Sequence, residues 1–328
     1  MSRSLSLGVA ASAGAAVILA LLPFALSGYN QVQASKVALY FVAILGLNIV
    51  TGYAGQISIG HGAFVAIGGY TTAVMSHDHG TNLLLTLPLA FVVAFGFGVA
   101  LGLPASRLSG VYLALATLAF AVSIPQLILK FSHFTGARNG ISVDESISYL
   151  WLYGVSWSCA AIAFVAAWLL LRGRIGRAFR AVRDSEVAAA SSGVSLVFYK
   201  TFAFGVSAGF AGVAGSLFVL ATNGFAQPDE FSVQLSLYIL IGAAVAGLGS
   251  LWGLVVGAAF VALIPTVSQS APLIGKLHEH NDVAFGIVVI LMMLLLPTGV
   301  AGLLHRAALT VEARRRRTKG GISAPEAR

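Results

Sequence analysis

The segment Leu83-Leu-Leu-Thr-Leu-Pro-Leu-Ala-Phe-Val-Val-Ala-Phe-Gly-Phe-Gly-Val-Ala-Leu-Gly-Leu103 decides the fold class. It carries no charged side chain, and its apolar residues form one block rather than an amphipathic stripe. About 20 residues of this kind, at the rise of an α-helix, cross the hydrocarbon core of a bilayer. The segment therefore predicts a transmembrane helix.

Similar apolar blocks recur along the whole chain of 328 residues, of which 58% are hydrophobic and 9% charged, with mean hydropathy +0.91. A soluble domain is about one quarter charged, so too few charges are present to cover a water-exposed surface. We expect an all-α, polytopic transmembrane bundle of about ten spans, with eight as the lower bound. The predicted spans are 8–27, 37–52, 57–75, 83–103, 109–130, 149–172, 200–221, 233–248, 250–268 and 283–303.

Three of these spans need comment. The first, 8–27, is long enough to cross and lacks a clean small-x-small cleavage site, so we interpret it as a retained helix. The span 57–75 is rich in glycine and carries polar residues, which allows a broken or re-entrant segment. The stretch 233–268 is barely long enough for two crossings.

The basic residues give the bundle a direction. With the N-terminus in the cytoplasm, 15 of the 19 Lys and Arg residues fall on the cytoplasmic side, which satisfies the positive-inside rule. Both termini are then cytoplasmic. The net charge of +8 is therefore a topology signal and does not indicate nucleic-acid binding. We divide the chain into a transmembrane domain, 1–305, and a basic tail, 306–328, which is expected to be disordered and could touch anionic lipid.

The acidic residues all fall in predicted loops or tails. They are Asp78, Asp144, Glu145, Asp184, Glu186, Asp229, Glu230, Glu279, Asp282, Glu312 and Glu326. An ion-coupled transporter usually needs a carboxylate inside the membrane, which makes that class the more remote alternative. The sequence also has no G-x-x-x-x-G-K-[ST] loop for ATP and no catalytic motif, so we expect neither a cofactor in this chain nor an enzyme.

Metal binding is not expected either. The single cysteine, Cys159, lies in an apolar block. The histidine pairs His77/His79 and His278/His280 lie in predicted outer loops, where ordinary polar loop tips are more common than metal sites. The sequence alone leaves those two pairs undecided.

One long basic loop, 172–200, has helical signals. Ile175, Phe179 and Val182 recur at helical spacing, and Asp184 or Ser185 can cap a second short helix. This predicts two short helices on the cytoplasmic surface, either as an interfacial anchor or as the docking element of a cytoplasmic motor. The residues assigned to coupling with that motor are Arg177, Arg180, Arg183, Asp184, Glu186, Ala188, Ala189 and Gly193.

The segment Gly52-Tyr-Ala-Gly-Gln-Ile-Ser-Ile-Gly-His-Gly-Ala-Phe-Val-Ala-Ile-Gly-Gly-Tyr70 is the second candidate site. Its glycines are costly in a helix and favour close packing or an unwound segment that lines a cavity. The candidates for a translocation path are Gln56, Ser58, His61 and Tyr70. A tightly packed crossing whose polar groups satisfy one another is the alternative.

Other glycines are assigned to helix packing because of their small-residue spacing. The packing candidates are Gly52, Gly55, Gly60, Gly205, Gly209, Gly249, Gly253 and Gly257.

Several motifs, taken in order, resemble one known family. The Gly52–Tyr70 segment resembles the G-x-x-G-x-x-S-x-G-H-x-A-F motif of branched-chain amino acid ABC importer permeases, of the LivM type. Val111-Tyr-Leu-Ala-Leu-Ala-Thr-Leu-Ala-Phe120 and Thr135-Gly-Ala-Arg-Asn-Gly-Ile141 resemble the next family segments, and likeness continues through the basic loop to the glycine-rich stretch 242–257. Two positions depart from the pattern: Ala137 replaces a loop glycine, and Glu186 lies one residue early for the E-A-A-x-x-x-G signature.

The resemblance implies a transport subunit in the bacterial inner membrane. It implies a second, related permease as partner, two cytoplasmic ATP-binding subunits that hold ATP and Mg²⁺, and a periplasmic substrate-binding protein. The implied cargo is branched-chain or related hydrophobic amino acids, imported by ATP-driven alternating access. Urea, an amide or another small organic solute is the alternative cargo for the same architecture.

Overall fold

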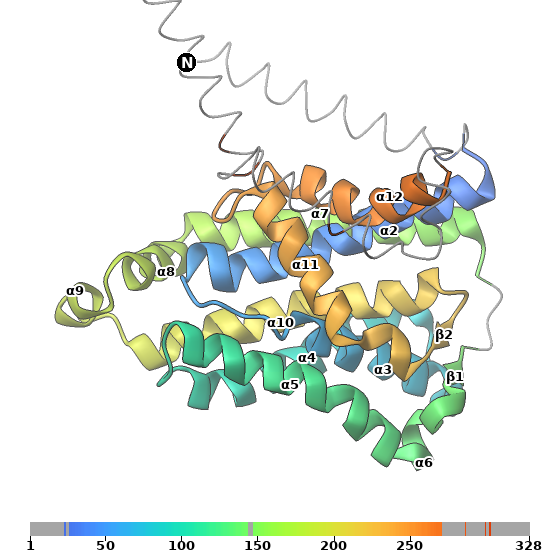
Figure 1. Ribbon diagram of the computed structural model, residues 1–328, viewed down its shortest axis with the longest axis horizontal. Coiled ribbons are helices and arrows are strands. Elements are labelled where there is room, and N and C mark those ends of the chain that lie inside the picture. Colours follow the sequence, from blue (N-terminus) through green and yellow to red (C-terminus); the bar gives the residue numbers. More distant parts are fainter. Residues whose placement is uncertain are drawn as a thin grey trace, which may run out of the picture.

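The computed structural model describes residues 26–143 and 147–270, together with the isolated positions 23, 286, 299 and 302. Within these residues, long helices lie side by side along the longest axis of the molecule (Figure 1). All but a few residues of the predicted spans 8–27 and 283–303 lie outside the described residues, as do the tail and the His278/His280 pair.

The helices of more than ten residues are α2 (Gly28–Leu47), α3 (His61–His79), α4 (Leu83–Ala105), α5 (Val111–Lys130), α7 (Tyr149–Arg172), α8 (Arg174–Asp184), α10 (Leu196–Ala221), α11 (Val233–Ala246) and α12 (Leu254–Ser270). The shorter elements are the π-helix η1 (Asn48–Tyr53), α6 (Ser132–Thr135), the 3₁₀ turns η2 (Ala137–Asn139) and η3 (Pro228–Phe231), α9 (Glu186–Ser191), and the strands β1 (Ile141–Ser142) and β2 (Phe225–Ala226).

Five segments in the described part of the chain are long and apolar enough to cross a membrane. They are Gly28–Tyr53, Leu83–Ala105, Val111–Lys130, Tyr149–Arg172 and Leu196–Ala221. They coincide with five of the predicted spans, so the multi-pass helical architecture is confirmed. The helices α3, α11 and α12 occupy three further predicted positions without being among these five, and the total of ten spans stays a prediction.

The core of the bundle surrounds α10. The most apolar window of α10 is 89% buried, whereas the corresponding windows of α4, α5 and α7 are only 28–33% buried. Large apolar side chains such as Val92, Leu115 and Ile162 are exposed on these three outer helices. Exposed apolar faces of this extent are expected where a helix meets lipid.

Small residues let the central helices approach closely. A methyl carbon added at Gly215 of α10 would overlap the Val65 carbonyl oxygen of α3, and one added at Gly68 would overlap the carbonyl of Gly212. These are α3–α10 backbone contacts of the kind that bind transmembrane helices without a hydrophobic driving force. Sequence reasoning did not single out this pair of helices.

Most of the glycines assigned to packing do face a neighbouring element. Gly205 and Gly209 pack against phenylalanines of α4, Gly253 and Gly257 approach the α11 backbone, and Gly60 approaches Thr117. Gly52 approaches Gly249 across the α11–α12 turn.

Gly55, Gly60, Gly249 and Gly253 lie outside helices. Gly55 and Gly249 correct the assignment, because their backbone conformation itself favours glycine. Their φ angles are +71° and +81°, a region that L side chains rarely adopt. The turn conformation, together with the nearby Arg183 side chain, explains glycine at these two positions.

One end of the bundle carries the only strands in the described residues, a small exception to the all-α prediction. β1 pairs antiparallel with β2, Ile141 opposite Ala226, and so fastens the loop after α5 to the loop after α10. In that loop Ala137 has φ of +51°, where the resembled motif carries glycine. We call this the sheet end, and the opposite end, with α8 and α9, the elbow end (Figure 1).

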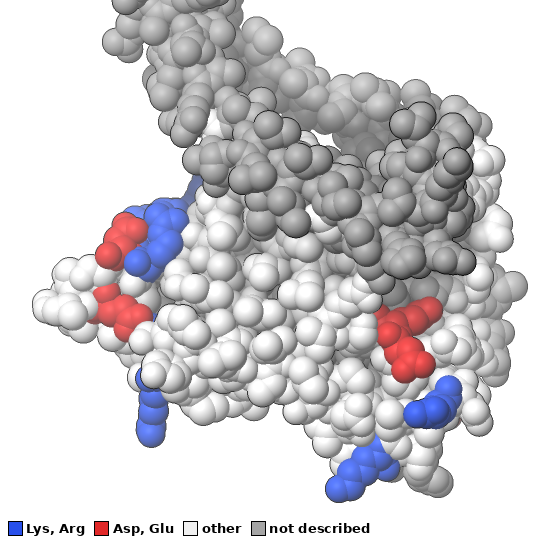
Figure 2. Space-filling view, viewed as in Figure 1, with Lys and Arg blue, Asp and Glu red and all other residues white. Residues whose placement is uncertain are grey.

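Charged side chains gather at these two ends. Figure 2 shows basic and acidic groups over the elbow end and the sheet end, with an uncharged band between them. Within the described residues, no Asp or Glu lies inside the five apolar segments. The band matches what a lipid-embedded surface requires.

Candidate functional site

The basic elbow, residues 172–200, consists of two short helices as predicted. In α8, Phe179 and Val182 are buried whereas Arg177 and Arg183 are exposed. The Ser185 hydroxyl accepts a hydrogen bond from the Ala188 amide at 3.3 Å and caps α9. Gly193, with φ of +81°, follows the end of α9.

An aromatic cluster holds the elbow to the bundle. The buried Phe179 ring lies 6.3 Å from the ring of Tyr199 and 6.5 Å from that of Phe202, both on α10. Burial of such rings is favourable and directional. A displacement of α8 would therefore displace the beginning of α10 as well.

Arg183 connects the elbow to the membrane helices directly. Its Nη1 donates a hydrogen bond of 2.9 Å to the carbonyl oxygen of Gly52, in the π-helix that ends the α2 segment. Its Nε lies 3.2 Å from Asp184 Oδ1. The Arg183 stem also packs on Gly55, so a larger residue there would meet it. π-helical turns often mark functional sites.

An ion pair joins the two ends of the second half of the elbow, α9 and the start of α10. Lys200 Nζ lies 2.7 Å from Glu186 Oε1, and the Lys200 side chain is only 5% exposed. Gln56 donates to the backbone carbonyl of Lys200 at 3.4 Å, and Lys200 donates to the Ser106 carbonyl at the same distance. α10 begins at Leu196, before the predicted span, so Lys200 belongs to the bundle rather than to a free loop.

Asn48 extends this junction to the α11–α12 turn. Its side-chain oxygen accepts from the Gly249 amide and its side-chain nitrogen donates to the Ser250 carbonyl, each at 2.8 Å. Asn48 is fully buried. We define the coupling junction as Asn48, Gly52, Arg183 and Gly249; sequence reasoning missed Asn48, whose only signal was an amide inside an apolar block.

Residues 54–60 are non-helical and pass between α2 and α3. Here the buried hydroxyl groups of two distant helices satisfy backbone donors: Thr117 accepts from the Ile59 amide at 3.0 Å, and Ser236 accepts from the Gly62 amide at 2.9 Å. Irregular backbone inside a membrane protein requires such partners. Of the predicted span 57–75, residues 57–60 are irregular, and α3 begins at His61 and continues without a break to His79.

We expect Thr117→Val to destabilise this irregular segment, because valine keeps the shape of threonine but leaves the buried Ile59 amide without an acceptor. The loss is about 1–3 kcal/mol, measured as a lower midpoint of thermal unfolding in detergent. Thr71→Val is the matched control, since the Thr71 hydroxyl donates only to the Ile67 carbonyl one turn earlier. Equal midpoints for the two variants would contradict the role given to Thr117.

The four path candidates are all buried within the single chain: Gln56 is 4% exposed, Ser58 and His61 are 1%, and Tyr70 is 6%. Gln56, Ser58 and His61 lie along or just after the irregular segment. Tyr70 is farther along α3, with its ring 5.7 Å from that of Phe231 near the sheet end. The structure therefore does not bring the four together in one open cavity.

Several of these polar atoms lack a partner in the described part of the chain. Among them are Gln56 Oε1, Ser58 Oγ and the Tyr70 hydroxyl. The alternative, a packed crossing whose polar groups all hydrogen-bond to one another, is therefore not fulfilled at these positions. A path role for them stays a prediction.

In residues 26–143 and 147–270, no group of three or more His, Cys, Asp or Glu side chains is placed to hold a metal ion. His77 and His79 lie in the last turn of α3.

Comparison with known proteins gives the family. The family described as "Branched-chain amino acid transport system / permease component" matches residues 32–297. The LivM permease of the high-affinity branched-chain amino acid transport system of Escherichia coli (strain K12) is 32% identical over 309 residues, which covers 85% of this chain and 71% of LivM.

More distant relatives are also permeases. The LivH permease of the same E. coli system is 24% identical and covers 80% of this chain and 91% of LivH. The autoinducer 2 import permease LsrC of Salmonella paratyphi B is 26% identical and covers 56% of this chain and 54% of LsrC. No solved structure matches significantly.

The matched range includes the irregular segment, the basic elbow and the coupling junction. The chain belongs to the branched-chain amino acid transport permease family of ABC importers.

Proposed function

We propose that this chain is the transmembrane permease subunit of an ABC importer that moves branched-chain or related hydrophobic amino acids inward across a bacterial inner membrane. Separate cytoplasmic subunits hydrolyse ATP, and a second, related permease completes the path. A periplasmic binding protein delivers the cargo to the sheet end. The elbow end is cytoplasmic, in keeping with the basic residues of α8.

The observation that carries this proposal is the contact between Arg183 of the elbow and Gly52 of the α2 segment. Through it a force on α8 reaches the π-helix, and through Asn48 it reaches the α11–α12 turn. Two membrane elements then move with one cytoplasmic element, which is what alternating access driven from outside the chain requires.

The elbow also presents a surface suited to a motor protein. α9 exposes Val187, 79% accessible, beside small residues that would fit a groove. The arginines Arg177, Arg180 and Arg183 lie on the neighbouring helix α8, and Ala188, Ala189 and Gly193 lie in α9 or just after it. This surface docks one ATP-binding subunit. The ATP-binding subunit holds the ATP and Mg²⁺, because this chain has no phosphate-binding loop.

The test is ATP hydrolysis by the purified complex of the chain with its partner permease, ATP-binding subunits and binding protein. We expect leucine, isoleucine or valine, supplied with the binding protein, to stimulate hydrolysis, and urea and simple amides to leave it at its basal rate. Failure to recruit an ATP-binding subunit would refute the proposal. Stimulation by urea or amides alone would assign the alternative cargo.

A further inference from the structure

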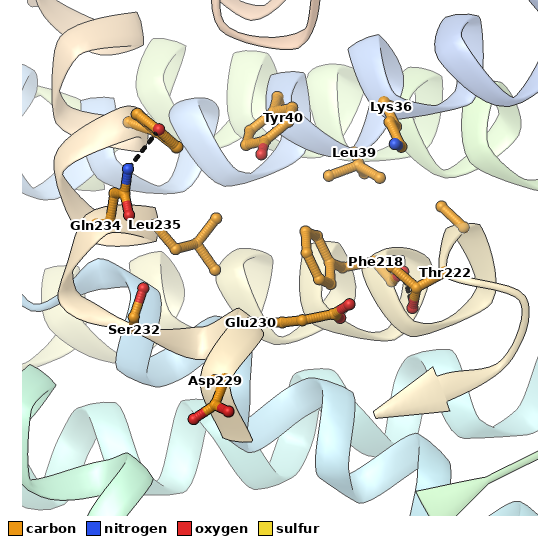
Figure 3. A pocket seen from close by; sticks show the side chains of 12 residues that line it. Lys36, Leu39, Tyr40, Phe218, Thr222, Asp229, Glu230, Ser232, Gln234 and Leu235 are labelled. Atoms are coloured by element: carbon orange, nitrogen blue, oxygen red, sulfur yellow. Dashed lines mark hydrogen bonds between the residues drawn. The ribbon is translucent and has the colours of Figure 1, made fainter. Parts of the chain in front are cut away.

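A polar cavity of about 370 Å³ opens near the sheet end, between α2, the end of α10, η3 and the start of α11. Its size lies within the range of small-molecule sites. None of the path candidates named from the sequence lines it. Figure 3 shows the side chains that do.

Opposite charges stand on different walls of this cavity, which Lys36 lines from one side and the acidic residues Asp229 and Glu230 from the other. Lys36 lies on α2 and Glu230 extends from η3, with the apolar side chains of Leu39 and Phe218 between them in the view (Figure 3). Lys36, Leu39 and Tyr40 fall on one face of α2, because they are three or four residues apart. The cavity thus joins a cation, an anion and an apolar wall.

Neither Lys36 nor Glu230 forms an ion pair with another described residue. In the described part of the chain, the ion pairs are Arg183–Asp184 and Lys200–Glu186, both at the elbow end. Glu230 Oε2 is buried and accepts no hydrogen bond from the described residues. Burial raises the pKa of the Glu230 carboxyl, and the Lys36 ammonium opposes that rise. A buried carboxylate oxygen without a donor gains most from a cationic ligand group.

An α-amino acid with an apolar side chain supplies the complementary groups. Its ammonium would donate to Glu230, its carboxylate would accept from Lys36, and its side chain would lie on Leu39 and Phe218. A neutral solute such as urea has neither charge and would leave both protein groups unpaired. The chemistry of the lining therefore selects a zwitterion.

We propose that this cavity is a binding site for the amino-acid cargo at the outer mouth of the permease, with Glu230 and Lys36 recognising its two charges. The inference rests on the proposed function and adds to it a binding site and two specificity-determining residues.

The test is equilibrium binding of three probes to the purified complex in detergent, without the binding protein. Leucine carries both charges, leucinamide lacks the carboxylate, and 4-methylpentanoate lacks the ammonium. We expect the wild-type complex to bind leucine most tightly. Glu230→Gln should weaken leucine binding about tenfold, the effect of one charge-assisted contact, and leave 4-methylpentanoate unchanged.

The reciprocal variant, Lys36→Met, should weaken leucine and 4-methylpentanoate and leave leucinamide unchanged. Asp78→Asn, at the exposed end of α3 and outside the cavity, is the matched control. Gel filtration and thermal unfolding show whether each variant is folded. The two variants are expected to weaken binding of different probes, so a single folded variant is enough to test the proposal.

Losses that are equal for all three probes, or no loss in either variant, would overturn the cargo site. So would unchanged leucine binding together with weaker docking of the binding protein, which would assign the two charges to that docking. A complex whose ATP hydrolysis responds to amino acids but whose cavity binds none of the probes overturns this inference alone. A complex that responds to no amino acid refutes the proposed function itself.

Discussion

Arg183→Ala is expected to lower amino-acid uptake about tenfold while the complex continues to hydrolyse ATP. The variant removes the 2.9 Å hydrogen bond to the Gly52 carbonyl, the direct contact between the elbow and the α2 segment. A hydrogen bond from a charged donor contributes about 1.5–3 kcal/mol. The Arg183 side chain is 39% exposed, so we take the lower end of that range, which corresponds to roughly tenfold.

The measurement is the number of amino-acid molecules imported per ATP hydrolysed, in vesicles that contain the complete importer. Arg174→Ala is the matched control, because Arg174 lies on the same helix, is not among the coupling residues, and its exposed side chain makes no hydrogen bond or ion pair with the described residues. Arg183→Lys keeps the charge but not the geometry of the guanidinium. Its number of amino-acid molecules imported per ATP should lie between the values for Arg183→Ala and for the control. A wild-type ratio in Arg183→Ala would show that the coupling junction does not transmit the ATPase cycle.

Gly215→Ala is expected to produce a large loss of stability for a single added methyl group. The added carbon would overlap the Val65 carbonyl oxygen, which belongs to the backbone of α3 and cannot rotate away. To make room, α3 and α10 would have to move apart at the point where their backbones approach each other. Overpacking of this kind costs about 1–3 kcal/mol or more.

We expect a fall of roughly 5–10 °C in the unfolding midpoint in detergent, and Gly68→Ala, on the facing helix, should behave in the same way. Gly96→Ala on α4 is the control, since no atom lies within 4 Å of the added carbon. Alanine favours a helix over glycine, so this control should be neutral or slightly stabilising. Equal midpoints for Gly215→Ala and Gly96→Ala would contradict the close α3–α10 contact.

The elbow could be predicted almost residue by residue because its signals are local. Ile175, Phe179 and Val182 define one face of α8, and Ser185 caps α9 through an amide three residues away. Amphipathic spacing and capping depend on neighbours within one or two helical turns. The apolar segments could be found for a similar reason, since crossing a bilayer requires only length and composition.

The partners of buried polar groups could not be predicted. Asn48 bonds to the turn after α11, Thr117 bonds to the irregular segment, and Lys36 shares a cavity with Glu230. Each pair is far apart in the sequence, and no periodicity connects its members. Gly55 and Gly249 were assigned to helix packing for the same reason, because a glycine in a turn and a glycine in a helix contact cannot be told apart by spacing alone.

The sequence by itself determined that this chain is a multi-pass helical membrane protein with a basic, two-helix elbow, and its ordered motifs identified the family. Hydropathy, charge bias and capping are short-range properties, which any folded form of the chain must express. The tertiary structure alone decided that Arg183 contacts Gly52, that α3 and α10 approach at their glycines, and that two opposite charges share a cavity at the sheet end. Those contacts depend on which helix faces meet, and helix packing fixes that only when the whole bundle has formed.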